Sequence, residues 1–133
     1  MKQNKTIFLI DDDPDDHEIF GLALSEIDHP VHCIYENDGA KAVEALNDDK
    51  ELKPDFIFID MNMPRMNGQE CLVEIKKIER LKDVPVFMYS TSADPESIQK
   101  NAKLGAADFI IKPSDINVLS AILSNIINAN ALQ

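Results

Sequence analysis

One apolar run limits what this chain can fold into. Residues 56–59 read Phe-Ile-Phe-Ile, end in a carboxylate at Asp60, and are followed by a loop that contains Pro64 and Gly68. A short apolar run bounded by turn residues is typical of a strand buried on both faces of a sheet. Asp60 would then lie at the carboxyl end of a central strand, which is where open α/β sheets place their chemistry.

The rest of the chain alternates strand and helix patterns. Expected strands cover about residues 5–10, 31–35, 56–59, 84–89 and 108–111. Expected helices start at Pro14, near Ala40, at Asn67 or Gly68, after Asp94 and after Asp115. Such alternation predicts a parallel sheet with helices on both of its faces. We therefore predict a doubly wound α/β fold with five parallel strands and five helices, forming one domain over residues 1–133. For the strand order we adopt 2-1-3-4-5, one of the two common doubly wound orders.

Charge and composition argue against several classes of protein. The formal net charge of −11 disfavours a nucleic-acid partner, because nucleic acids require a basic face. No apolar run approaches the roughly 18 residues that a membrane span needs, and no secretion signal opens the chain. Cys33 and Cys71 lack metal-ligand spacing, so we expect buried free thiols and a reducing cytoplasm.

Polar side chains follow all five expected strands. They are Asp11, Asp12 and Asp13 after the first strand, Glu36 after the second, at the expected edge of the sheet, Asp60 and Asn62 after the third, Ser90 and Thr91 after the fourth, and Lys112 after the fifth. In the predicted strand order the first and third strands flank the crevice, so Asp11, Asp12 and Asp60 would converge. A divalent cation relieves the repulsion among carboxylates, and oxygen ligands suit Mg²⁺ or Mn²⁺. Lys112 and Ser90 would complete a pocket for a tetrahedral dianion.

These motifs make the chain resemble the receiver domain of two-component response regulators, from about Thr6 to Ile127. The motifs are Asp11-Asp12 after an apolar strand, Asp60 in Ile-Asp-Met-Asn-Met-Pro, Ser90 after Phe-Met-Tyr, and Lys112-Pro113 after Phe-Ile-Ile. The resemblance implies a flavodoxin-like fold and a phosphorelay function. The donor would be a sensor histidine kinase or a histidine phosphotransfer protein. Because six residues follow Ile127, we expect a stand-alone regulator whose output is binding.

The resemblance also implies a role for each residue of the pocket. Asp60 is the expected phosphoacceptor. Asp12, Asp60 and the backbone carbonyl of Asn62 would be direct Mg²⁺ ligands, and Asp11 would hold a metal-bound water. Lys112 is expected to pair with Asp60 and then with the phosphoryl oxygens.

A switch is implied beside the pocket. Ser90 would move toward the phosphoryl group, and Phe109 would then turn inward and change the surface of the fourth helix, fifth strand and fifth helix. Thr91 would narrow access to the phosphoacceptor. The peptide bond before Pro113 is expected to be cis.

Several positions keep two interpretations. Asp13 is either a helix N-cap or a substitute metal group. Asp15 and Asp16 fall in the first turn of the first helix, where the helix dipole favours acids, and we expect them at the surface. The histidines lack ligand spacing and are expected in surface or packing roles: His17, His29 and His32.

The last helix carries more apolar residues than a one-sided helix needs. It either packs a wide face on the sheet or exposes a patch for a partner or a homodimer. The residues are Ile116, Val118, Leu119, Ile122, Leu123, Ile126, Ile127 and Leu132.

Three other functions compete with the phosphoacceptor. A phosphohydrolase with an aspartyl-phosphate intermediate needs an acid two residues after the nucleophile, but Asn62 occupies that position. A flavodoxin-like nucleotide carrier needs a phosphate-binding loop after the first strand, where aspartates would repel phosphate. A receiver-like binding module that is never phosphorylated is the third. We expect no enzyme activity other than assistance to the domain's own phosphorylation and dephosphorylation.

Overall fold

The computed structural model describes residues 4–131, and its strands form one parallel sheet. The strands are β1 (Lys5–Ile10), β2 (Val31–Glu36), β3 (Phe56–Asp60), β4 (Val86–Ser90) and β5 (Asp108–Ile111). They pair in the order β2-β1-β3-β4-β5, which confirms the predicted topology. β4 begins two residues later than predicted, because Pro85 has no N–H to donate to the sheet.

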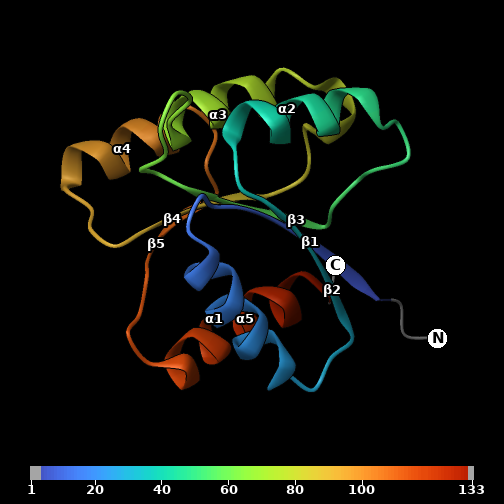
Figure 1. The fold of residues 1–133 in the computed structure, drawn as a ribbon, viewed down its shortest axis with the longest axis vertical. Helices are drawn as coiled ribbons and strands as arrows, with labels where there is room; N and C mark the ends of the chain where they lie inside the picture. The colour runs from blue at the N-terminus through green and yellow to red at the C-terminus, as the bar shows by residue number, and fades with distance from the viewer. Residues whose placement is uncertain (1–3, 132–133) are drawn as a thin grey trace.

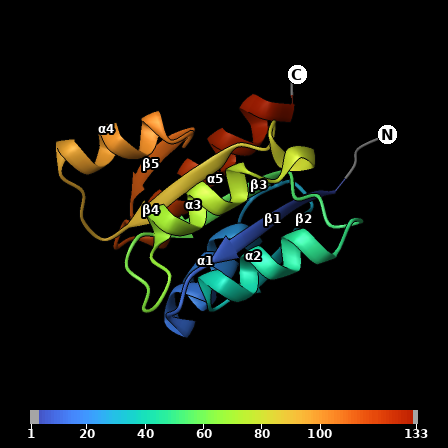
Figure 2. The ribbon, with the colours of Figure 1, turned by 90° about the horizontal axis from the view of Figure 1, so that it is seen from above.

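The helices cover both faces of this sheet. They are α1 (Pro14–Ser25), α2 (Gly39–Asp48), α3 (Gly68–Lys76), α4 (Pro95–Lys103) and α5 (Ile116–Ala131), with a short 3₁₀ turn at Glu79–Leu81. In Figure 1, α1 and α5 lie below the sheet, and α2, α3 and α4 lie above it. Figure 2 shows the second group of helices from above. Within the described residues, no helix is long and apolar enough to cross a membrane.

Two apolar cores, one on each face, explain the continuous apolar runs of the strands. Along β3, Phe56 and Phe58 belong to the core under α1 and α5, whereas Ile57 and Ile59 belong to the core under α2 and α3. Successive strand side chains point to opposite faces, so a strand covered on both sides needs apolar residues throughout. The central position predicted for this strand is confirmed.

Side-chain caps fix where the helices begin. The Asp13 carboxylate accepts a hydrogen bond from the Asp15 backbone N–H, with Pro14 in the first helical position of α1. Asn67 and Glu70 form a reciprocal capping box at the start of α3. The N-cap interpretation of Asp13 is therefore confirmed. These helix starts follow the carboxyl ends of strands, so the caps also position the loops at that edge.

The last helix packs a wide face on the sheet, because Ile116, Ile122 and Ile126 also pack against the core under α1 and α5 as partly buried residues. Leu119, Leu123 and Ile127 are buried on the sheet, while Val118 is 49% exposed. Leu132 lies outside the described residues. Cys71 is buried and Cys33 is half-buried, and both are free thiols.

Arg80 ties the end of α2 to the turn that follows α3. Its Nη2 donates to the carbonyl oxygens of Leu46 at 2.6 Å, Asp49 at 2.5 Å and Leu52 at 2.9 Å. The last turn of α2 has no basic residue of its own to bind its free carbonyls. A distant arginine therefore supplies this C-terminal cap.

Replacing Arg80 by Met should lower the free energy of unfolding by about 2 kcal/mol, because hydrogen bonds from a charged donor contribute about 1.5–3 kcal/mol. Urea denaturation measures this change. Lys82→Met is the matched control, because Lys82 is 61% exposed and pairs with Glu79 at 3.1 Å. That substitution should cost less than about 1 kcal/mol. Equal losses in the two variants would contradict the capping role.

Candidate functional site

Three carboxylates meet where β1 and β3 end. Asp11 directly follows β1, Asp60 is the last residue of β3, and the register pairs Ile10 with Ile59 just before them. One carboxylate oxygen from each of Asp11, Asp12 and Asp60 lies within 4.8 Å of the others. Asp11 is 0% and Asp60 5% exposed, and Asp12 is exposed. The carboxylates converge as predicted, because neighbouring parallel strands end at the same edge of the sheet.

The loop after β3 holds Asp60 against the start of α3. Gly68 donates its backbone N–H to the Met61 carbonyl oxygen at 3.0 Å. A Cβ atom at Gly68 would lie 2.7 Å from Met61 Cα and closer still to the Asp60 carbonyl oxygen. Glycine is therefore required by close approach of two backbone segments. The Asn62 backbone N–H in turn donates to Asp60 Oδ1 at 3.2 Å.

Lys112 brings a positive charge to these carboxylates from the end of β5. Its backbone N–H donates to the Ser90 carbonyl oxygen at 2.7 Å. Its Nζ lies 2.7 Å from Asp16 Oδ2, 3.0 Å from Asp11 Oδ2 and 3.6 Å from Asp60 Oδ1. The expected pairing with Asp60 is therefore present but is the longest of the three. The Tyr89 ring centroid lies 5.1 Å from the same nitrogen.

Asp16 was expected at the surface, and that prediction was wrong. Its side chain is only 23% exposed and makes the shortest contact of Lys112. Side chains near the start of a helix lean back toward its N-terminus, and the N-terminus of α1 faces the crevice. Its position one turn after the Asp13 cap was the only sequence signal for this contact.

His17 is a second contact that sequence reasoning did not identify. Its Nε2 lies 2.5 Å from the Asp11 carbonyl oxygen. A carbonyl oxygen only accepts hydrogen bonds, so Nε2 carries the proton and donates it. The ring also stacks on Tyr35 at a centroid distance of 5.1 Å. His17 thus has the packing role that we expected, and it also supports the backbone of Asp11.

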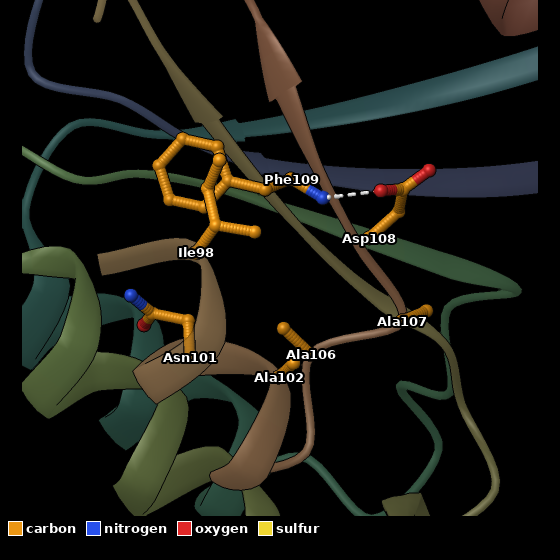
Figure 3. Close-up of a pocket in the computed structure, with 7 residues that line it drawn as sticks. All are labelled: Ile98, Asn101, Ala102, Ala106, Ala107, Asp108 and Phe109. Atoms are coloured by element: carbon orange, nitrogen blue, oxygen red, sulfur yellow. Dashed lines mark hydrogen bonds between the residues drawn. The ribbon is translucent and has the colours of Figure 1, made fainter. Parts of the chain in front are cut away.

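Ser90 and Phe109 lie beside the carboxylates. Ser90 is 1% exposed at the end of β4, and its Oγ accepts from the Ser92 N–H at 3.4 Å. Ser90, Asn62 and Phe109 line a cavity of about 130 Å³. Phe109 also lines a second cavity, of about 90 Å³, between α4 and β5 (Figure 3). Thr91 is exposed and is not part of the lining of either cavity.

The peptide bond before Pro113 is trans, because residues 4–131 contain no cis peptide. The expectation of a cis bond was therefore wrong. The trans isomer is lower in energy by about 0.5–1 kcal/mol for an X–Pro bond. The contacts of Lys112 with Ser90, Asp11 and Asp16 are all made with this isomer.

The electrostatics of the pocket show an excess of negative charge. Burial, and to a lesser extent the nearby Asp60 charge, raise the pKa of Asp11 to about 7, although the hydrogen bonds from the Asp13 N–H and Lys112 lower it. Burial also raises the pKa of Asp60, although Lys112 and the Asn62 N–H lower it. Burial lowers the pKa of Lys112, but its contacts with Asp16 and Asp11 outweigh this and raise it. Carboxylate oxygens that one lysine leaves undercompensated fit a divalent cation.

When a chelator removes divalent cations, Asp11→Asn should have a higher melting temperature than the parent chain. This difference in melting temperature should be largest at high pH. The folded chain holds the Asp11 proton up to about pH 7, whereas the ordinary value is 3.8. Stability from this group is therefore present at low pH and is lost as the pH rises from about 4 to about 7. The variant avoids that loss, so its gain should grow over the same interval.

Melting curves recorded across that pH range measure the effect. Asp15→Asn is the control, because Asp15 is exposed in the same helical turn as Asp16. Its melting temperature should show no gain over that of the parent chain that grows with pH across this interval. A pH-independent gain for Asp11→Asn would contradict the assignment.

Comparisons with known proteins agree with this geometry. A family model described as the response regulator receiver domain matches residues 7–124. The two-component response regulator ORR1 of Oryza sativa subsp. japonica is 36% identical over 112 residues, covering 80% of this chain and 48% of that protein. The structure of the phosphorylated cyanobacterial phytochrome response regulator RcpA is similar at a TM-score of 0.83 and 30% identity, covering 93% of this chain and 91% of that one.

A further solved structure contains a cation. The Mn²⁺-bound form of response regulator Rcp1 has a TM-score of 0.79 and 26% identity, over 92% of this chain and 91% of that one. The chain spans about half the length of ORR1 and 27% of a protein-glutamate methylesterase/protein-glutamine glutaminase from Methanospirillum hungatei to which it is 36% identical. Because the family match over residues 7–124 includes most of β1, the other four strands and every carboxylate of the pocket, this chain belongs to the response regulator receiver domain family.

Proposed function

We propose that Asp60 accepts a phosphoryl group from a phosphohistidine in a two-component phosphorelay. The donor is a sensor histidine kinase or a histidine phosphotransfer protein. The observation that carries this proposal is a nearly buried carboxylate at the end of the central strand, with Lys112 Nζ 3.6 Å from its Oδ1. In the transfer, the N–P bond of the donor breaks, an O–P bond forms at Asp60, and the histidine nitrogen takes a proton. Asp60 needs no general base, because an ionised carboxylate is already a nucleophile.

The residues of the pocket fit a Mg²⁺ site, with Mn²⁺ as an alternative. Asp12, Asp60 and the backbone carbonyl of Asn62 would hold the ion directly, and Asp11 would hold it through a water molecule. The carboxylate oxygens that approach within 4.8 Å of one another support this assignment. When bound, such an ion neutralises charge on phosphoryl oxygens. The Mn²⁺-bound form of the similar regulator Rcp1 is a second line of support.

Side chains around Asp60 would position the phosphoryl group, and some of them would move when it binds. Lys112 donates to phosphoryl oxygens, and Ser90 at the end of β4 supplies a hydroxyl donor. Thr91, which is exposed beside Ser90, limits access of the donor. Phe109 lines cavities of about 130 Å³ and about 90 Å³, so its ring has space in two directions. A Ser90 shift toward the phosphoryl group would let Phe109 turn inward and change the surface of α4, β5 and α5.

Incubation with acetyl phosphate and Mg²⁺ should attach one phosphoryl group to the chain, and Asp60→Asn should remove essentially all of this uptake. The amide cannot form an acyl phosphate. Intact mass and lability to hydroxylamine measure the product. Asp55→Asn is the matched control, because Asp55 lies at the other end of the same strand and accepts from the Thr6 N–H at 2.8 Å.

Chelation separates the metal requirement from the nucleophile. EDTA should abolish the uptake in the parent chain, and Asp12→Asn should require at least about tenfold more Mg²⁺ for half-maximal uptake, since loss of one charged ligand costs more than about 1.4 kcal/mol. If no donor phosphorylates the chain, it is a receiver-like binding module instead. Steady turnover of a phosphoester would favour the phosphohydrolase, against which Asn62 argues.

The α4–β5–α5 face is proposed as the surface that signals. It exposes three large apolar side chains, Ile98 at 40%, Ile111 at 49% and Val118 at 49%. Exposed large apolar side chains on each of these three elements favour a protein partner. We propose that a second phosphorylated copy of the chain is one such partner. The net charge of −11 supports protein partners over nucleic acid, and the free thiols support a cytoplasmic setting.

Val118→Lys should therefore weaken dimerisation of the phosphorylated chain by at least about tenfold, because a buried unpaired charge costs more than about 1.4 kcal/mol. Sedimentation of the protein before and after phosphorylation measures the mass. Leu22→Lys is the control, since Leu22 on α1 is equally exposed at 48%. A parent chain that stays monomeric after phosphorylation would remove the homodimer from the proposal.

A further inference from the structure

The ammonium of Lys112 is shared among carboxylates, and the nearest of them has no part in the proposed chemistry. Nζ lies 2.7 Å from Asp16 Oδ2 but 3.6 Å from Asp60 Oδ1. Within residues 4–131 its ion-pair partners are Asp11, Asp16 and Asp60. The lysine therefore rests nearer to α1 than to the proposed phosphoacceptor.

The backbone of α1 keeps Asp16 in this place. The Asp13 carboxylate caps the helix and Pro14 occupies its first position. His17, the next residue, donates to the Asp11 carbonyl oxygen and stacks on Tyr35. Asp16 thus lies between the Asp13 cap and His17, and the contacts of these two residues fix the first turn of α1. The contact of Asp16 with Lys112 is therefore fixed by the way α1 begins, unlike a flexible ion pair at the surface.

A phosphoryl group on Asp60 has to compete for the same ammonium. An ammonium has three N–H donors, and two of them are directed at Asp11 and Asp16. Among the described residues one donor stays free, so the competition is for the position of Nζ, which lies nearer to Asp16 than to Asp60. Asp11 is fully buried, so leaving it unpaired is costly. Asp16 is 23% exposed and regains water when it is released. Asp16 is therefore the partner that Lys112 can exchange for a phosphoryl oxygen.

We propose that Asp16 is a positioning residue that draws Lys112 away from Asp60 in the resting state and competes with the phosphoryl group for it. The inference rests on the proposed function of Asp60. It makes Asp16 a determinant of how strongly this receiver favours its phosphorylated form. The ordinary dipole role of a first-turn acid does not predict such competition, because any acid in that turn would serve the dipole.

Beryllium fluoride with saturating Mg²⁺ is a non-covalent probe of the phosphoryl site. Calorimetric titration should show that Asp16→Asn binds it about fivefold more tightly than the parent chain, the size of effect expected when one charge-assisted hydrogen bond no longer competes. Asp15→Asn removes the same charge from the same helical turn, and its affinity should stay within about twofold. Asp16→Glu restores the charge, and its affinity should return toward that of the parent chain.

A second measurement detects the contact between Lys112 and Asp16 without metal or fluoride. In NMR spectra that detect lysine ammonium groups, the Lys112 signal should shift in Asp16→Asn and stay in place in Asp15→Asn. Thermal unfolding of each variant establishes that it is folded.

The outcomes separate this inference from the function on which it rests. A parent chain that binds no beryllium fluoride overturns both the proposed function and this inference. If the parent chain binds the probe while Asp16→Asn binds it equally or more weakly, the competition alone is overturned. Equal tightening in Asp15→Asn and Asp16→Asn would show a general charge effect and would also overturn the competition.

Discussion

The structure depends on one electrostatic imbalance at the edge of its sheet. Asp11, Asp16 and Asp60 lie around one ammonium group, and Asp12 lies close to Asp11 and Asp60. Asp11 and Asp60 are almost fully buried. Buried carboxylates repel one another and lose hydration, which is why the pKa of Asp11 and that of Asp60 are raised. A fold tolerates such an arrangement only where a ligand compensates the charge. The imbalance is therefore the physical basis of the proposed cation and phosphoryl chemistry.

The strands and helix starts around the site keep these charged side chains close together. Apolar residues on both faces of β1 and β3 make the strands rigid, so their ends are well positioned. Gly68 lets α3 begin against the Asp60 backbone, and Asp13 sets the start of α1. Each of these two features is local in sequence. Gly68 helps to place Asp60, and the Asp13 cap helps to place Asp16, and both carboxylates contact Lys112 from another element. Stability and function thus rest on the same few contacts at the carboxyl edge.

Sequence reasoning reached the alternation of strands and helices from local patterns. It reached the convergence of Asp11, Asp12 and Asp60 by adopting a common doubly wound strand order, which the structure confirms. It placed Lys112 next to Asp60, whereas the structure places it nearer to Asp16 and Asp11. It assigned Asp16 to the surface, because an acid in a first helical turn normally serves the helix dipole. It also expected a cis bond before Pro113, which is trans. The misjudged details all concern side-chain direction or backbone isomer.

The amino-acid sequence by itself determined the alternation of strands and helices and the polar groups delivered at each strand end. It left the strand order as one of the two common doubly wound orders, and the structure decided between them. Continuous apolar runs, proline and glycine positions and helix caps are local signals, and they act over a few residues. Only the tertiary structure decided which carboxylate takes the ammonium of Lys112, and that Phe109 lies between two cavities. Those outcomes depend on differences of a few tenths of an ångström in the distances between side chains from separate elements. Such distances are set by packing of the whole domain, because many alternative pairings satisfy the same local pattern.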